Sequence, residues 1–75
     1  SMKSMTFHQL GGSCDIIFSA ETFDELADQS QHHGREMITA GDAAHLAAMN
    51  EMMEIMKSGQ MDAWMEARRA EFESL

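Results

Sequence analysis

Apolar residues between positions 42 and 58 recur at a spacing that predicts a helix with a wide apolar face. Successive residues of a helix are turned by about 100°, which places the apolar side chains of this segment on one half of the cylinder. The residues on this half are His45, Leu46, Met49, Met52, Met53, Ile55 and Met56. A single neighbouring element does not cover so wide a face, and we therefore expect two partners, one of them from another subunit.

A helix over residues 22–40 is predicted to precede this one. Thr22 and Glu25 have the spacing of a capping box, in which the threonine side chain accepts a hydrogen bond from the third amide of the helix. Gly41 can take the left-handed conformation that ends a helix, and Asp42 can cap the helix that follows. The two helices are therefore expected to be joined by a short link.

The third predicted helix covers residues 61–75 and has a narrow apolar stripe. The stripe consists of Met61, Trp64, Met65, Phe72 and Leu75. Arg68 falls inside it, so its charge must extend to solvent, stack on an aromatic ring or pair with a carboxylate. We expect an ion pair with Asp15 or Glu21, or one across a dimer, in preference to an arginine that holds an anionic ligand.

Residues 5–20 come before the helices and predict a β-hairpin. Two strand-like segments, 5–10 and 14–20, flank Gly11-Gly12-Ser13, whose glycines can take the positive φ of a tight turn. The element order ββααα predicts an α+β fold, in a single domain over residues 1–75, with an N-terminal β-hairpin packed on three helices.

The chain has 75 residues, of which 44% are apolar, and a single cysteine. A domain this small buries only about 60% of its unfolded-chain surface and often needs reinforcement. Because an intrachain disulfide requires two cysteines, we expect reinforcement by homodimer formation, with a bound metal ion as the second option. Ser1 before Met2 resembles the scar of a cleaved expression tag.

Thirteen acidic and five basic residues give a net charge of −8. The cations form no basic stripe, so neither nucleic acid nor an anionic membrane is an expected partner. No apolar run approaches the ~20 residues of a membrane span and no secretion leader is recognisable, which favours a cytoplasmic protein. The sequence lacks paired carboxylates, a phosphate loop, a nucleophile elbow and a dinucleotide fingerprint, so nothing in it indicates an enzyme or a cofactor.

Several short motifs resemble a group of small bacterial proteins of uncharacterised function. The motifs are Leu10-Gly11-Gly12-Ser13-Cys14-Asp15, Glu21-Thr22, Ala40-Gly41-Asp42-Ala43-Ala44-His45, Trp64 and Arg69-Ala70-Glu71-Phe72. The resemblance covers nearly the whole chain and implies the fold, but no activity. In that group a cysteine often stands where Phe7 stands here, so a cysteine pair that serves metal or redox chemistry in relatives would be lacking in this chain.

His45 and the methionines that follow it at helical spacing allow two interpretations. An imidazole together with thioethers suits Cu(I). Methionine also fills irregular gaps in cores and interfaces, because it is flexible and polarizable. A single helix presents its sulfurs in a row and not around a centre, so packing is the favoured interpretation.

Cys14 and His33 are a second pair of candidates. Cys14 can serve as a zinc ligand or a nucleophile if a histidine lies close to it in the fold, and His33 lies at the edge of the apolar stripe of its helix. The chain contains neither Cys-x-x-Cys nor His-x-x-x-His spacing. The favoured interpretation of Cys14 is therefore a small buried hydrophobic side chain.

Taken together, these patterns predict a homo-oligomeric structural or protein-interaction module. The residues of its predicted interface are Met49, Met52, Met53, Met56, Trp64, Arg68 and Phe72. The alternative is a small ligand- or metal-binding protein that uses Cys14, His33, His45 and the methionine-rich helix face.

Overall fold

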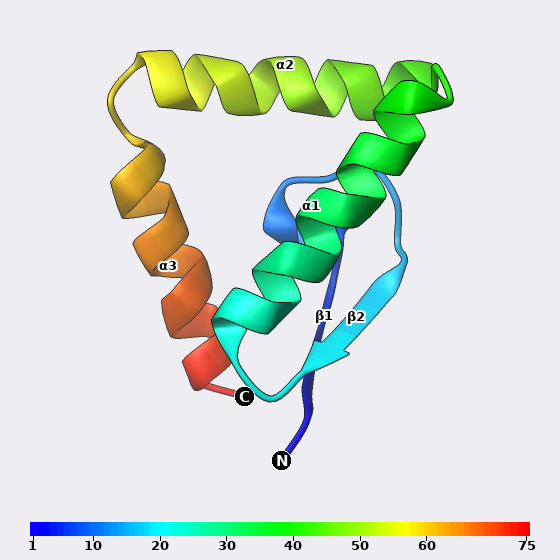
Figure 1. Cartoon of the computed structure of the whole chain (residues 1–75). Helices are drawn as coiled ribbons and strands as arrows, with labels where there is room; N and C mark the ends of the chain where they lie inside the picture. The colour runs from blue at the N-terminus through cyan, green and yellow to red at the C-terminus, as the bar shows by residue number, and fades with distance from the viewer.

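A computed structural model describes all of residues 1–75 and confirms the α+β order of a hairpin followed by three helices (Figure 1). The hairpin pairs strands β1 and β2 in antiparallel fashion. The elements are β1 (Lys3–Thr6), a short 3-10 helix η1 (His8–Leu10), β2 (Ile17–Ala20), α1 (Phe23–Thr39), α2 (Ala43–Lys57) and α3 (Met61–Glu73).

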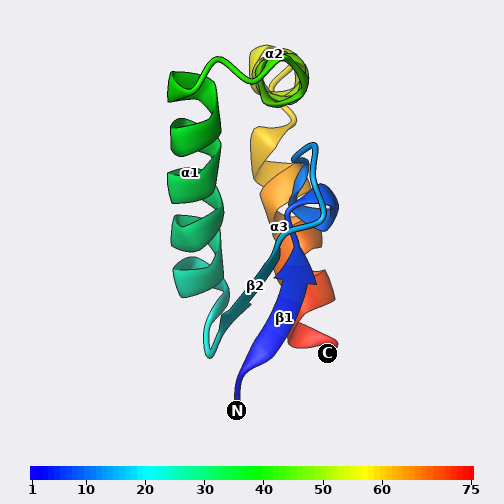
Figure 2. The same ribbon diagram turned by 90° about the vertical axis from the view of Figure 1, so that its right-hand side faces the viewer.

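The molecule is a thin slab that measures 35 × 27 × 15 Å along its principal axes. Helix α1 packs against β2 and helix α3 against β1. Helix α2 crosses the C-terminal end of α1 and the N-terminal end of α3 (Figure 1). Both termini lie at the opposite end of the molecule. Figure 2 shows α2 end-on at this position. None of the helices is long and apolar enough to cross a membrane.

The hairpin is shorter than the sequence predicts. Strand pairing ends at Thr6 and Ile17, so residues 7–16 form the connection and the expected strand character of 7–10 and 14–16 is wrong. The side chains of Thr6 and Gln9 explain the early end. The Thr6 N–H donates to Gln9 Oε1 at 2.7 Å, and the Gln9 N–H donates to Thr6 Oγ1 at 3.1 Å. These local bonds compete with a strand ladder and close the chain into η1.

The helix caps follow the sequence signals in part. Thr22 Oγ1 accepts a hydrogen bond from the Glu25 N–H at 3.2 Å, which is the first half of the predicted capping box. Gly41 has a φ of 76° and follows the end of α1. Asp42 caps α2, since its Oδ2 accepts from the His45 N–H at 3.0 Å. The link between α1 and α2 is thus fixed at both ends.

The apolar core lies between the hairpin, α1 and α3, and extends from Phe72 to Phe7, whose ring stacks on His45 of α2. Eight hydrophobic side chains are buried: Met5, Phe7, Leu10, Phe18, Ala20, Phe23, Leu26 and Phe72. Phe23 and Phe72 meet edge to face, with ring centroids 6.0 Å apart, which joins the start of α1 to the end of α3. Phe72 is 1% exposed, so it belongs to this core and not to a free surface as the interface prediction assumed.

Helix α2 contributes little to the core. His45 is its only buried residue. Four of its large apolar side chains are substantially exposed: Leu46, Met49, Met53 and Met56. The wide apolar face predicted for this helix is therefore covered only in part by the rest of the chain.

Candidate metal centre

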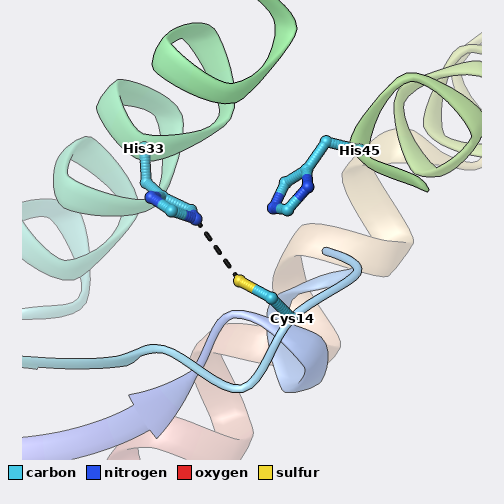
Figure 3. A group of neighbouring side chains, drawn as sticks. All are labelled: Cys14, His33 and His45. Atoms are coloured by element: carbon cyan, nitrogen blue, oxygen red, sulfur yellow. Dashed lines mark hydrogen bonds between the residues drawn. The ribbon is translucent and has the colours of Figure 1, made fainter. Parts of the chain in front are cut away.

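Three side chains that can bind a metal ion converge near the start of α2. Cys14 comes from the connection between the strands, His33 from α1 and His45 from α2, and the three point toward a common centre (Figure 3). Their ligand atoms all lie within 4.8 Å of one another, and no other His, Cys, Asp or Glu side chain joins the group. The fold therefore brings together residues that the sequence separates by up to thirty-one positions.

The separation of Cys14 and His33 matches that of two ligands on one metal ion. Cys14 Sγ lies 3.3 Å from His33 Nε2. On a tetrahedral zinc ion, with Zn–S of about 2.3 Å and Zn–N of about 2.0 Å, a sulfur and a nitrogen are roughly 3.5 Å apart. The widest separation in the cluster, 4.8 Å, would have to close by about 1 Å for all three to bind. Rotation of side chains can supply such a movement.

The ring of His45 is held in one orientation by Asp42. His45 Nδ1 lies 2.6 Å from Asp42 Oδ2. Because an ionised carboxylate can only accept, Nδ1 carries the proton of this hydrogen bond. The pKa of Asp42 is lowered from its ordinary value, chiefly by this bond and then by the bond from the His45 backbone N–H. In the neutral ring, Nε2 is thereby left with a free lone pair.

That second nitrogen of His45 is buried and has no hydrogen-bond partner. The residue as a whole is only 6% exposed. Buried polar atoms are paired in the great majority of cases, so an unpaired one requires an explanation. Metal-binding histidines commonly donate their other N–H to a carboxylate, as His45 does to Asp42. A metal ion would satisfy the orphaned nitrogen.

Phe7 forms an apolar wall beside the two imidazoles. Its ring stacks on His45, with centroids 5.5 Å apart, and meets His33 edge-on at 4.8 Å. Phe7 is 8% exposed and belongs to the core, so it anchors the cluster to the packed part of the molecule. Phe7 thus contributes a ring that contacts both histidines.

Two glycines give the Cys14 loop its path. Gly11 has a φ of 89°, in the left-handed region that other residues rarely adopt. A Cβ on Gly12 would overlap the ring of Phe7. The Gly-Gly pair was predicted as a hairpin turn, and it serves instead to let the loop fold over Phe7 on its way to Cys14.

The neighbouring His32 does not take part. It is exposed to solvent, and its Nε2 lies 2.6 Å from Glu36 Oε1 one turn further along α1. Cys14 is half-buried and packs against the apolar core, in line with the favoured interpretation, and its thiol also lies 3.3 Å from His33 Nε2. Asp42 was predicted only as a helix cap. Its second role could have been inferred from the histidine three residues later, since a cap carboxylate can reach that side chain.

An apolar cavity of about 290 Å³ lies between α1, α2 and α3. Met49, Met52 and Trp64 line it together with Phe7. The ring of Phe7 also contacts both histidines, so only this ring separates the cavity from them. Ser30 and Gln31 are the polar residues of its wall that carry hydrogen-bonding side chains. Part of the methionine-rich face of α2 therefore looks into this cavity, while Met53 and Met56 face outward with 39% and 56% exposure.

Arg68 pairs within its own helix. Its Nη2 lies 2.8 Å from Glu71 Oε1, and its guanidinium lies over the ring of Trp64 at 5.1 Å. The expected partners Asp15 and Glu21 were wrong, because Glu71 is one turn away on the same face of α3. The adjacent Arg69 joins α3 to the start of α1 through Asp24 at 2.9 Å.

The chain was compared with protein-family models, with curated proteins and with solved structures, and none of the three comparisons finds a match. No function can therefore be transferred from a relative. The geometry of the Cys14–His33–His45 cluster and the surface of α2 are the two features from which a function can be argued.

Proposed function

We propose that this protein binds a transition-metal ion, with zinc as the favoured ion, through Cys14, His33 and His45. The observation that carries the proposal is the buried Nε2 of His45, which has no hydrogen-bond partner while the other ring nitrogen is tied to Asp42. This arrangement leaves a lone pair at the cluster that contains a thiol and a second imidazole. We also propose a reducing compartment such as the cytoplasm, where this thiol stays free.

The donor set supports zinc over the harder divalent ions. Thiolate and imidazole are preferred ligands of zinc, whereas magnesium and calcium prefer oxygen. The same donors also suit copper, whose sites include sets of two histidines and one cysteine. The interpretation of the sequence as a Cu(I) site requires methionine sulfurs in addition to His45. Met49 and Met52 line the apolar cavity instead, which favours the three-residue cluster as the site.

A metal ion would also add a connection between three parts of the chain. The three ligands come from the Cys14 loop, from α1 and from α2, and α2 has no other buried side chain than His45. Binding energy of a metal that prefers the folded state adds to the free energy of unfolding. We therefore expect zinc to stabilise the whole chain and to fix α2 in particular.

The test is the melting temperature of the metal-free protein with and without zinc. At a free zinc concentration one hundred times the dissociation constant, the added stability is about 2.7 kcal/mol. For a domain of this size we expect the melting temperature to rise by about 10–20 °C. Cys14→Ser and His33→Ala should each remove most of this rise.

His32→Ala is the matched control, because His32 adjoins His33 but points to solvent and pairs with Glu36. This variant should keep the full response to zinc. An unchanged melting temperature of the wild type would contradict the proposal, and so would a response that survives His33→Ala. If Cu(I) and not zinc produces the shift, the cluster is retained as the site and the favoured ion changes.

The exposed apolar side chains of α2 favour a second candidate function, self-association into a homodimer. Exposed apolar patches of this kind mark protein interfaces. The chain exposes 4918 Å² of surface, compared with about 4,600 Å² expected for a folded monomer of its mass. Leu46, Met53 and Met56 would be covered by the same face of a second copy, while the buried Phe72 takes no part.

Sedimentation or native mass spectrometry at micromolar concentration tests this candidate. We expect a dimer that Met56→Glu converts to monomers, because the new charge would have to be buried in the interface. Glu54→Gln is the matched control on the exposed polar side of α2 and should leave the dimer intact. A monomeric wild type would contradict self-association without affecting the metal site.

A further inference from the structure

We infer that the metal ion held by this cluster keeps one coordination position open, and that this position accepts a small thiol from solution as its thiolate. The inference rests on the proposed metal site and names the class of ligand that completes it. Its basis is the number of ligands, the charge of the bound ion and the access from solvent.

The chain supplies three ligands and not four. Cys14, His33 and His45 are the only His, Cys, Asp or Glu residues whose ligand atoms gather here. Asp42 is occupied on the opposite edge of the His45 ring, where it holds Nδ1. Structural zinc sites have four protein ligands, whereas sites that exchange ligands have three and leave the fourth position to water or a substrate. The cluster has three protein ligands, as in sites that exchange their fourth ligand.

The charge of the bound ion favours an anionic fourth ligand. A divalent ion with one thiolate and two neutral imidazoles carries a net charge of +1. The carboxylate of Asp42 would act through the His45 ring and not on the ion directly. A soft donor atom suits a site that already contains sulfur and imidazole. A thiolate combines the negative charge with the soft atom.

Access to the open position comes from the side of Cys14 and His33. Both residues are half-buried, whereas His45 is buried and Phe7 closes the side toward the core. A ligand that approaches from solvent therefore meets the ion beside the thiol.

The binding step is an exchange of ligands without oxidation or reduction. The thiol R–SH loses its proton to solvent, its sulfur forms a bond to the ion, and a bound water molecule leaves. The thiolate lowers the net charge of the centre from +1 to zero. Coordination to a divalent ion is sufficient to deprotonate a thiol at neutral pH.

Cobalt(II) bound to the otherwise unmodified full chain provides the test. Cobalt reports each bound thiolate by a sulfur-to-cobalt charge-transfer absorption and reports coordination geometry by its visible bands. The protein with one Co(II) should show the band of Cys14. On titration with 2-mercaptoethanol, we expect the charge-transfer absorption to rise about twofold and to saturate, with one added thiol per chain by native mass spectrometry.

Ethylene glycol, which replaces the sulfur of the probe by oxygen, is the matched control and should leave the spectrum unchanged. A Cys14 band that does not respond to the thiol would overturn the open position. Cobalt shared between two chains would overturn it as well, since the second copy would then supply the fourth ligand. Loss of cobalt from the protein during the titration counts equally against it. Absence of any cobalt–thiolate band would contradict the metal site itself and is distinguishable from these results.

Discussion

The two ends of this small molecule are built in different ways. At the end that carries the termini, the hairpin, α1 and α3 enclose side chains such as Leu26 and Phe72, which are 0% and 1% exposed. At the other end, α2 crosses α1 and α3 with a single buried residue, His45, whose neighbours are a carboxylate, a thiol and a second imidazole. One end is held by apolar burial alone, and the other combines the apolar contact of Phe7 with polar groups that can bind a ligand.

The difference indicates how the chain divides stability and chemistry. Apolar contacts are insensitive to pH and to metal, so the packed end maintains the fold under all of these conditions. Contacts made by titratable groups respond to protons and ions. Regions with few buried apolar contacts open locally at a lower free energy than the core does. We therefore expect α2 to be the least stable helix in the absence of metal, and the one that metal binding strengthens most.

The largest effect is expected from a cavity at the packed end. Phe72→Ala should cost about 3–5 kcal/mol, since the ring is fully buried and its neighbours cannot collapse into the space. A domain of this size has a total stability of roughly 4–11 kcal/mol, so the variant should lose a large share of its free energy of unfolding. Urea denaturation followed by circular dichroism measures the loss. Phe72→Leu, which conserves much of the volume, should cost far less, and equal losses for the two variants would contradict the packing argument.

At the α2 end the corresponding change should have a local effect. We expect His45→Ala to lower the free energy of opening of α2 by about 1–3 kcal/mol while leaving the core amides protected. Hydrogen exchange of the metal-free protein resolves the two regions. Leu46→Ala alters the adjacent residue, which is 46% exposed, and should change little. A uniform loss of protection over all helices would show that the two ends are a single cooperative unit.

A smaller and more specific effect is expected from Asp42→Asn. Asparagine is as good a helix cap as aspartate, so α2 should remain intact, but it no longer forces the proton onto His45 Nδ1. Loss of such an outer carboxylate typically lowers metal affinity 10–100-fold. Competition with a chelator measures the affinity, and Asp62→Asn, in the first turn of α3, serves as the control. Equal zinc affinities for Asp42→Asn and the wild type would exclude an orienting role.

The same carboxylate predicts a dependence on pH. Since the pKa of Asp42 is lower in the folded chain than in the unfolded chain, its contribution to stability is complete above the ordinary aspartate value near pH 4. The contribution is lost as the pH falls through the lowered pKa. In an acid titration of the metal-free protein, the wild type should therefore lose stability relative to Asp42→Asn only below about pH 4.

The smallest effect is expected at Arg68, on α3 between the two ends. Its pair with Glu71 lies one turn along the same helix and is partly exposed, so Arg68→Met should cost less than about 1 kcal/mol. The methionine would keep the contact with Trp64 through its apolar stem. A loss of several kcal/mol in urea denaturation would instead indicate a buried ion pair whose second member had been left uncompensated.

The fold was accessible from sequence because its signals are local. The cap at Thr22, the glycine after α1 and the helical spacing of apolar residues each depend on a few consecutive positions, and the order of elements follows from them. The predicted strand ends were wrong because of local hydrogen bonds that the apolar pattern does not reveal. The hydrogen bonds between Thr6 and Gln9 fold the chain into η1, and no alternation of apolar residues reveals them.

For the candidate site, the sequence could predict the participating residues but not that they lie together. Cys14, His33 and His45 are named together in the alternative sequence prediction, but the sequence gives no evidence that the three converge in space. Their convergence depends on how α2 crosses α1, which is a matter of tertiary packing that a single sequence does not encode in its spacing. Burial of Phe72 escaped prediction for a similar reason, since a residue on an apolar stripe can face its own core or a partner equally well.

Gly12 shows that a position can resist substitution without touching a ligand. The ring of Phe7 occupies the position that the Cβ atom of any other amino acid would take at this residue. A mutational scan would therefore mark this half-exposed loop residue as intolerant, and a reader of that scan alone would assign it to a binding surface. The intolerance would in fact report on the ring of Phe7, which contacts both histidines, and would measure how strictly the loop must be shaped to bring Cys14 to them.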